Sequence, residues 1–341
     1  MLKIKFTEIE AVSPAYLAKT FTLQPDRSVA RQTDGYLTHG IATVMPMSME
    51  ELLPYLQQLT PNFVLTYGVP EYDQALVLSS KVRETWDNDI EDLPVIGRDN
   101  AHFRWNSGRP GILMLDHDLL EGQSPFTREQ LLNALYGVCP ALENAPHIWA
   151  PSASSCIYYP DGSEYRGLTS QRVLFAIEKG SDVPRLLRTL NIKLWLNGFG
   201  FIRISSSGVQ LVRSIIDTCT AQPSRIDFIG GANCLGGLVQ RRQELITGFN
   251  LNAPFLKRDD YPKLTWKERR EYENLVNLAK RLYLHHTQSA KKILSKTAVA
   301  DGLIKVPVGR GDYPGVNRNF LSSPDALDRL LLEKAEQLYL E

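Results

Sequence analysis

An apolar stretch that ends in two aspartates is the feature that most constrains this chain. It reads Gly111-Ile-Leu-Met-Leu-Asp-His-Asp-Leu-Leu120 and is typical of a short buried strand with a polar end. Because alternate side chains of a strand share one face, Asp116 and Asp118 are expected side by side, with His117 on the other face. Two adjacent carboxylates repel each other and are costly to bury. The pair therefore predicts a site for Mg²⁺ or Mn²⁺, although a strand that merely runs into a polar turn has the same pattern.

Composition excludes some classes of protein. Hydrophobic residues make up 43% of the 341 residues, and Lys+Arg and Asp+Glu both number 38, so only local patches could attract nucleic acid. The length fits roughly two domains. The four cysteines are far apart and form no CxxC pair, which predicts neither zinc nor a disulfide framework. With no apolar run long enough for a membrane and no signal segment, we expect a cytoplasmic protein.

Hydrophobic periodicity and capping signals predict alternating helices and strands without a regular βαβ series. Helices are expected over 48–59 and 127–136, from Asp182, from Thr265, and from Ser323 to the last residue. Strands are expected over 62–67, 147–158, 172–177 and 201–204. Residues 103–105 and 111–116 flank a Gly/Pro turn and are expected to form a hairpin that carries the acidic pair.

Nucleotidyl transfer with two metal ions commonly needs a third carboxylate and cations for the triphosphate. Asp217 follows an Ile-Ile pair and is one candidate for the third acid, and Asp227 is the other. Arg172 begins an apolar strand, two residues after Ser170, and its planar guanidinium suits a phosphate.

In this order, the motifs resemble the archaeo-eukaryotic primase superfamily, in particular the primase-polymerase domains of plasmids, phages and other mobile genetic elements. The resemblance covers about residues 95–245. The matching stretches are 103–105, 111–118, 150–155, 167–175, 182–184, 194–200, 211–217 and 225–228.

The resemblance implies a role for each matching residue. Asp116 and Asp118 correspond to the first motif and Asp217 to the third, which makes all three catalytic and metal-binding. The second motif, usually Ser-x-His, binds the incoming nucleotide, and here it reads Ser170-Gln-Arg172. Arginine keeps the positive charge but cannot exchange a proton as histidine does. Arg225 corresponds to a basic residue that contacts nucleotide or template.

The implied fold is α+β, with an RRM-like antiparallel-sheet core joined to an N-terminal α/β unit and followed by a C-terminal helical domain. We expect a catalytic domain over 1–258 and a helical accessory domain over 259–341. Residues 263–296 contain nine Lys or Arg and three Glu, which favours template binding in this context. The predicted DNA-binding residues are Arg269, Arg270, Lys291, Lys292 and Lys296.

The expected activity is therefore that of a DNA primase or polymerase, a nucleotidyltransferase that uses Mg²⁺ or Mn²⁺, NTPs or dNTPs, and a single-stranded DNA template. No helicase motif is present, so a helicase would be a fused or separate partner. Two alternatives stay open. One is a catalytically weak replication initiator that binds origin DNA through the same fold, and the other is a phosphatase with a DxD motif, although such enzymes usually place the pair near the chain start.

Overall fold

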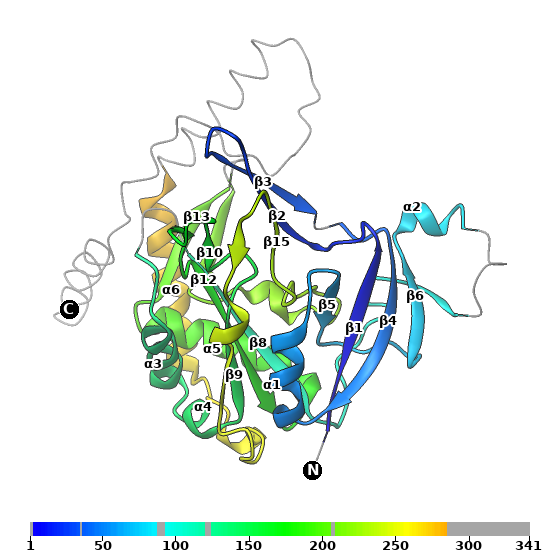
Figure 1. The fold of residues 1–341 in the computed structure, drawn as a ribbon. Helices are drawn as coiled ribbons and strands as arrows, with labels where there is room; N and C mark the ends of the chain where they lie inside the picture. The colour runs from blue at the N-terminus through cyan, green and yellow to red at the C-terminus, as the bar shows by residue number, and fades with distance from the viewer. Residues whose placement is uncertain (1–2, 35, 87–92, 120–123, 206–208, 285–341) are drawn as a thin grey trace, which may run out of the picture. The chain divides into compact units, whose positions relative to one another are not determined.

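The computed structural model describes the chain except for residues 1–2, 35, 87–92, 120–123, 206–208 and 285–341. Helices alternate with sheets that are mainly antiparallel (Figure 1), so the predicted α+β class is confirmed. None of the described helices is both long and apolar enough to cross a membrane. No disulfide joins the four cysteines, all of which lie in the described part.

The chain divides into two compact units. Of the described residues, the first contains those of Met1–Asp118, Pro125–Leu190 and Asp217–Pro262, and the second contains those of Asn191–Ile216 and of the chain from Lys263 to Leu284. The predicted domain boundary at residue 259 lies close to this last transition. The second unit also includes residues 191–216, which the prediction assigned to the catalytic domain.

A five-stranded sheet in the first unit has the order β5-β1-β4-β6-β7. All its pairs are antiparallel except β6 with β7. The strands are β1 (Ile4–Ser13), β4 (His39–Met47), β5 (Phe63–Thr66), β6 (Gln74–Leu78) and β7 (Val95–Gly97). Helix α1 (Met49–Gln58) follows β4 and begins where expected, because Ser48 and Glu51 form a reciprocal capping box.

A four-stranded antiparallel sheet in the same unit has the order β17-β9-β12-β8. Its strands are β8 (Gly111–Asp118), β9 (His147–Pro151), β12 (Ser170–Ile177) and β17 (Thr247–Phe249). Strand β12 is buried along its whole length and pairs with β8 from Ser170 opposite Asp118 to Ile177 opposite Gly111. The predicted acidic pair thus lies on an edge strand, at the end where β12 begins.

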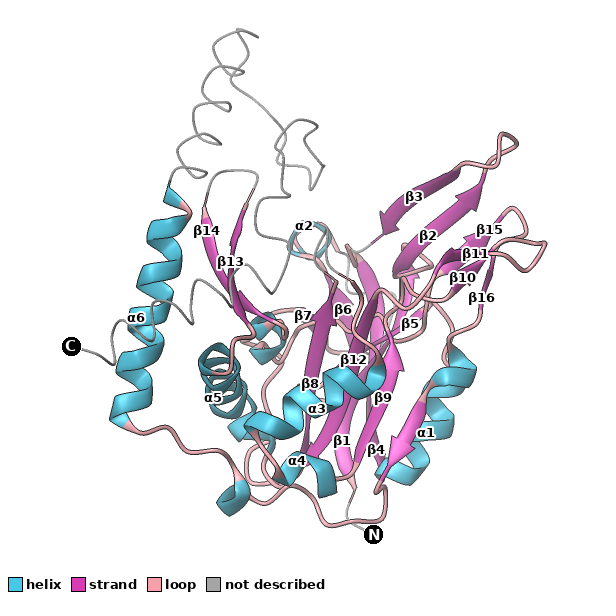
Figure 2. Cartoon of the chain, turned by 90° about the vertical axis from the view of Figure 1, so that its left-hand side faces the viewer, coloured by secondary structure: helices cyan, strands magenta, loops and turns pink. Residues whose placement is uncertain are grey.

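The described part of the first unit also contains two three-stranded sheets, three further α-helices, the start of α5 and several short 3-10 helices. The sheets have the orders β11-β10-β16 and β15-β2-β3, and Figure 2 shows β2 and β3 side by side as a long hairpin. The strands are β2 (Ala18–Leu23), β3 (Val29–Asp34), β10 (Ile157–Tyr158), β11 (Glu164–Arg166), β15 (Asn233–Leu235) and β16 (Val239–Gln240). The helices are α2 (Ser80–Arg83), α3 (Arg128–Val138) and α4 (Ala141–Asn144).

The largest described core of the first unit lies between the four-stranded sheet, β1 and β5 of the five-stranded sheet, and α1. Alternation within the strands builds it, because every second side chain of each strand points into this layer. Its buried members include Phe6, Leu52, Leu56, Leu65, Ile112, Met114, Ile148, Leu174 and Ala176. Asp116 and Arg172 continue the alternation of Met114 and Leu174, so the core ends in charged residues.

The predicted hairpin between 103–105 and 111–116 is wrong. Arg104 instead exchanges two backbone hydrogen bonds with Val69, and β8 pairs with β12. The intervening turn packs on the chain near Gly180, whose amide donates to the carbonyl of Arg109 at 2.8 Å. Gly111 and Gly180 touch so closely that a Cβ on Gly111 would lie 2.5 Å from the Cα of Gly180. Strand β8 pairs with β12 over eight residues, and this long pairing replaces the short local hairpin.

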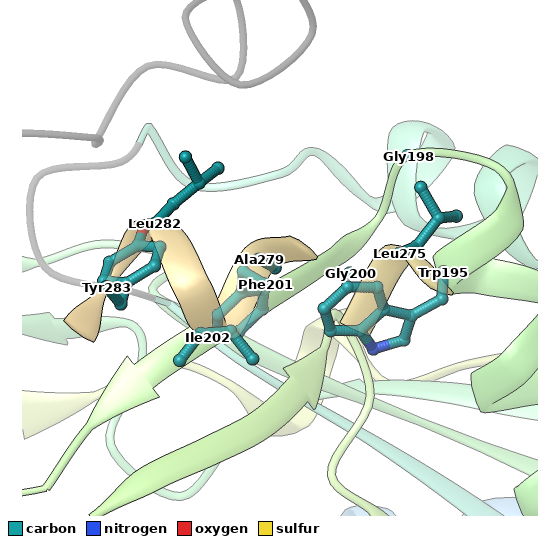
Figure 3. Close-up of a pocket in the computed structure, with 9 residues that line it drawn as sticks. All are labelled: Trp195, Gly198, Gly200, Phe201, Ile202, Leu275, Ala279, Leu282 and Tyr283. Carbon is teal, nitrogen blue, oxygen red and sulfur yellow. The ribbon is translucent and has the colours of Figure 1, made fainter. Parts of the chain in front are cut away.

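In the second unit, helix α6 (Trp266–Leu282) packs on the hairpin of β13 (Gly200–Ile204) and β14 (Gln210–Ser214). Their shared core contains Trp195, Ile202, Val276 and Ala279, and Trp195 lies near the end of α5 (Val183–Leu196). Figure 3 shows the small apolar pocket at this junction, with the indole of Trp195 beside Gly200. A Cβ on Gly200 would lie 2.0 Å from that ring, so only glycine fits there.

Most predicted elements are confirmed. The helices expected at 48–59, 127–136, from Asp182 and from Thr265 are α1, α3, α5 and α6, and each of the four expected strand regions contains at least one strand. The helix expected from Ser323 lies outside the described residues.

Leu174 offers a test of the core. It is fully buried between the two sheets, so Leu174→Ala should lower the free energy of unfolding by about 2–5 kcal/mol through lost burial and a cavity. The measurement is urea denaturation followed by circular dichroism. Leu245→Ala removes the same atoms from a side chain that is 44% exposed and should cost much less. Equal losses in the two variants would contradict this packing.

Candidate active site

The acidic pair and the predicted phosphate-binding pair face each other across two strands. In the register of β8 and β12, Asp116 lies directly opposite Arg172, and Asp118 lies directly opposite Ser170. All four residues therefore belong to one face of the sheet, since they occupy alternate positions in paired strands. The sequence placed these residues in separate motifs, and the sheet brings them together.

The other face of β8 carries His117, as strand alternation predicts. Its imidazole lies beside the ring of Phe126, with 5.0 Å between the ring centroids. Its cross-strand partner Gln171 has an amide that donates to the carbonyl of Phe126 and accepts from the indole of Trp149 at 2.8 Å. His117 is thus part of a packed polar layer and does not line up with the acids.

Arg172 is buried, with its guanidinium between two aspartates. One of them, Asp227, forms a direct ion pair with Nη1, and its carboxylate is fully buried. The other, Asp116, lies farther away, with 3.7 Å between its Oδ1 and Nη2 of Arg172. The hydroxyl of Tyr67 donates to the second oxygen of Asp227 at 2.6 Å. Arg172 is therefore held in place before any ligand arrives.

The two candidates for the third acid have different surroundings. The backbone amide of Asp217 donates to the carbonyl of Asp116 at 2.8 Å, which brings Asp217 beside the acidic pair. Its carboxylate accepts from the amide of Cys219 at 3.0 Å and caps the short helix Thr218–Ala221. Asp227 instead neutralises Arg172. Asp217 is thus the acid adjoining the pair, and its role as a metal ligand stays a prediction.

Asp116 has an unusual protonation equilibrium. The pKa of its carboxyl is raised to about 6: burial is the main cause, Arg172 opposes it, and the charges of Asp118 and Asp217 add to the rise. The side chain keeps 23% of its surface exposed, so a ligand can reach it. A carboxylate that resists ionisation beside two other acids is stabilised by any cation that binds there.

The chemistry of these oxygens fits a hard divalent cation. Oδ1 of Asp116 is buried and accepts no hydrogen bond, so it has a lone pair to offer. Mg²⁺ is typically held by one or two carboxylates together with substrate phosphates. Across the described residues, no group of three or more His, Cys, Asp or Glu side chains has the arrangement of a metal site. Asp116 and Asp118 are two such carboxylates, and their role as metal ligands stays a prediction.

Ser170 is buried at the start of β12, where a serine-rich loop fixes its backbone. The hydroxyl of Ser155 accepts from the amides of Thr169 and Ser170, both at 3.2 Å, and donates to the carbonyl of Ser170 at 3.0 Å. The amide of Ser152 also donates to that carbonyl, at 2.8 Å. The loop therefore sets the position from which Ser170 faces Asp118.

A cluster of cations next to the acids was not expected from the sequence. It consists of Lys19 on β2, Arg31 on β3, Arg166 on β11 and Arg172. Burial lowers the pKa of Lys19, and the charges of Arg31, Arg172 and Arg166 lower it further, while Asp118 opposes the shift. The ammonium of Lys19 donates to the hydroxyl of Ser154 at 3.3 Å. Nothing near Lys19 in the sequence signals this position, because β2 belongs to a different sheet from β8 and β12 and only packing between the sheets brings Lys19 to the acids.

Arg166 belongs to the same cluster. Burial lowers the pKa of its guanidinium, and the charge of Arg31 lowers it further. Its Nε donates to the hydroxyl of Thr169 at 3.2 Å. Crowded cations in one place repel each other, so the cluster favours a multiply charged anion beside Asp118. A polyphosphate has that charge.

Arg225, the other predicted nucleotide-binding residue, is exposed and adjoins a different cation. The pKa of Arg98 is lowered mainly by its burial and then by the positive charge of Arg225. Nη1 of Arg98 donates to the carbonyl of Ser224 at 3.2 Å. Arg225 therefore faces Arg98, and its predicted contact with nucleotide or template stays a prediction.

A second buried guanidinium, that of Arg242, holds the backbone next to the site. Arg242 is completely buried and donates to the carbonyl of Pro151 at 3.0 and 3.2 Å and to that of Ile229 at 2.5 Å. Burial lowers its pKa to about 9, and the charge of Arg172 contributes. These bonds fix the end of β9, where the serine-rich loop begins. No motif around Arg242 predicts this role.

The predicted DNA-binding residues belong to the second unit. Arg269 and Arg270 are exposed on α6. Lys291, Lys292 and Lys296 lie outside the described residues.

Comparison with known proteins adds no identification. No family model, curated protein or solved structure matches the chain.

The raised pKa of Asp116 leads to a test of stability against pH. Between about pH 4 and pH 6 the folded protein keeps a proton that the unfolded chain has released, so this carboxyl makes stability fall as the pH rises. Asp116→Asn cannot titrate. Relative to the wild type, it should therefore gain up to about 3 kcal/mol between pH 4 and pH 7. The measurement is urea denaturation in EDTA at several pH values, and parallel curves for the two proteins would contradict the assignment.

Proposed function

We propose that this chain is a DNA primase-polymerase that joins nucleotides on a single-stranded DNA template. The observation that carries the proposal is that acidic side chains on β8 lie beside a cationic side chain on β12. Asp116 and Asp118, with Asp217 adjoining, lie opposite Arg172 and Ser170, and Lys19 on β2 is near enough for its charge to act on both aspartates. Acids that can hold a divalent cation beside cations that can hold a polyphosphate are what nucleotidyl transfer needs.

The order of elements supports the family resemblance. Strand β8, helix α3, strand β9, strand β12 and helix α5 follow each other as β-α-β-β-α, and the elements inserted in the described chain are the short α4, two short strands and the 3-10 helix Gly180–Asp182. The three strands lie in the order β8-β12-β9, as in the first three strands of a ferredoxin-like or RRM-like sheet. An RRM-like core with the acids on its edge strand is therefore part of the proposal.

In the proposed reaction, Lys19, Arg166 and Ser170 bind and orient the triphosphate of the incoming nucleotide. Arg172 is fixed by Asp227 and adds positive charge where negative charge develops. Asp116 and Asp118 would hold Mg²⁺ or Mn²⁺, with Asp217 as the third ligand. Such ions, when bound, stabilise the attacking and leaving oxygens. Arginine in place of the usual histidine means that Arg172 cannot relay a proton.

A second candidate is the replication initiator that binds origin DNA with little or no catalysis. The observation that favours it is the ion pair with Asp227, because a guanidinium already neutralised by a buried carboxylate has less charge to offer a phosphate. Template-directed synthesis separates the two candidates, because an initiator of this kind binds DNA without extending a primer.

The decisive experiment is primer synthesis and extension by the complete protein with labelled nucleotides, single-stranded DNA and Mg²⁺ or Mn²⁺. Asp118→Asn should abolish incorporation without unfolding the protein, because Asp118 is exposed at the end of β8. Asp73→Asn is the matched control, since that side chain is 93% exposed on a loop. Full activity of a folded Asp118→Asn protein would overturn the proposal.

Lys19 separates nucleotide binding from catalysis. Lys19→Gln should raise the KM for nucleotide by about tenfold or more, the range for a lost hydrogen bond to a charged group, and should leave DNA affinity nearly unchanged. Lys5→Gln, on a side chain that is 42% exposed and pairs with Asp73, is the control. An unchanged KM in the Lys19 variant would remove the cation cluster from the nucleotide site.

A further inference from the structure

One face of α6 combines a large exposed aromatic side chain with cations and amides. Trp266, the first residue of the helix, is 74% exposed, although tryptophan is usually well buried. Arg270, Asn274, Asn277 and Arg281 follow it at intervals of four, four, three and four residues, and all are exposed. Residues three and four apart lie on one side of a helix, so these five form a continuous stripe, here named the α6 stripe.

The packed side of the helix explains why the stripe faces away from the hairpin. Leu275, Ala279 and Tyr283 line the pocket with Trp195 and Ile202, as Figure 3 shows for the same helix. Tyr272 and Val276 belong to the same cluster. The stripe lies on the opposite side of the helix and is not needed to hold α6 on its hairpin.

The acidic residue of the first turn is turned away from the stripe. Glu268 accepts from the ammonium of Lys193 at 2.5 Å and closes the capping box with Thr265. The pKa of Glu268 is lowered to about 2, mainly by the hydrogen bond from Lys193. Its charge is thus neutralised within the unit, while Lys263, Lys267 and Arg270 stay exposed around Trp266. Of the two exposed glutamates of this helix, Glu273 is three residues from Arg270 and four from Asn277 and therefore shares the face of the stripe, whereas Glu271 lies to one side of it.

Aromatic, cationic and amide side chains in one row match single-stranded nucleic acid. Every base has a flat face that can stack on an indole, and the backbone phosphates pair with arginine. A duplex keeps its bases stacked inside and offers nothing to Trp266. A protein partner would more often cover an apolar face, which this stripe lacks apart from the tryptophan.

We propose that the α6 stripe is a binding track for single-stranded DNA, in which a base stacks on Trp266 and Arg270 and Arg281 contact two separate phosphates of the same strand. The track is about 22 Å long, from the rise of 1.5 Å per helical residue. The choice of DNA over RNA rests on the proposed function, and the track itself rests on the stripe. It extends the predicted role of Arg269 and Arg270 to an aromatic residue outside the sequence motifs.

The test is binding of a fluorescently labelled oligothymidine to the complete protein by anisotropy, without nucleotide or divalent cation. Trp266→Ala should weaken binding about tenfold or more, the range for loss of one base stack, whereas Trp266→Phe should keep most of the affinity. Binding of a blunt duplex should be the same in all three proteins. Tyr72→Ala removes an aromatic ring that is 47% exposed in the first unit and should change nothing.

The two arginines have a separate signature. Arg270→Gln with Arg281→Gln should lower the slope of log affinity against log salt by about 1.4, because each phosphate contact on a single strand contributes about 0.7. Wild-type affinity and slope in the folded variants would overturn the track. Asp118→Asn should bind DNA normally here. If the wild type makes DNA but Trp266→Ala binds it normally, the track fails and the proposed function stands; if binding depends on Trp266 but the wild type makes no DNA, the proposed function fails and the track stands.

Discussion

The ion pair between Arg172 and Asp227 is the interaction on which the rest of the first unit depends. Arg172 belongs to the four-stranded sheet, and Asp227 forms a backbone bridge with Leu65 on the five-stranded sheet. The pair therefore joins the two layers at the point where their shared apolar core ends. A buried pair of this kind adds little net stability. Removing one partner leaves the other charge buried and unpaired, which commonly costs about 3–5 kcal/mol. The site and the packing of the sheets are thus set by the same contact.

The sequence predicted two kinds of feature: which face of a strand a side chain occupies, and where a capped helix begins. Asp116 and Asp118 share a face and His117 lies on the other, because a strand leaves no alternative once its core side is fixed. The starts of α1, α3 and α6 follow from their capping boxes. These features depend on neighbours within a few residues, and such neighbours are visible in a sequence.

The features that the sequence did not reveal depend on contacts between distant segments. The hairpin at 103–105 failed because the register of β8 with β12 was stronger than local turn chemistry. Lys19 reaches the acids from a strand about a hundred residues earlier in the chain, and Arg242 supports them from after the third motif. Asp217 and Asp227 looked equivalent in the sequence, since both follow apolar residues. Only the backbone bond to Asp116 and the ion pair with Arg172 distinguish them.

The crowding of Lys19, Arg31, Arg166 and Arg172 also couples folding to the surrounding solution. Repulsion among these cations works against the folded state, and the polyphosphate of the proposed function would offset it, so on that proposal the folded protein binds polyanions more tightly than the unfolded chain does. By mass action, an anion at one hundred times its dissociation constant adds about 2.7 kcal/mol to the free energy of unfolding. The melting temperature then reports occupancy of the cluster, whether or not any chemistry follows. Even inorganic triphosphate would act as a folding ligand for this chain.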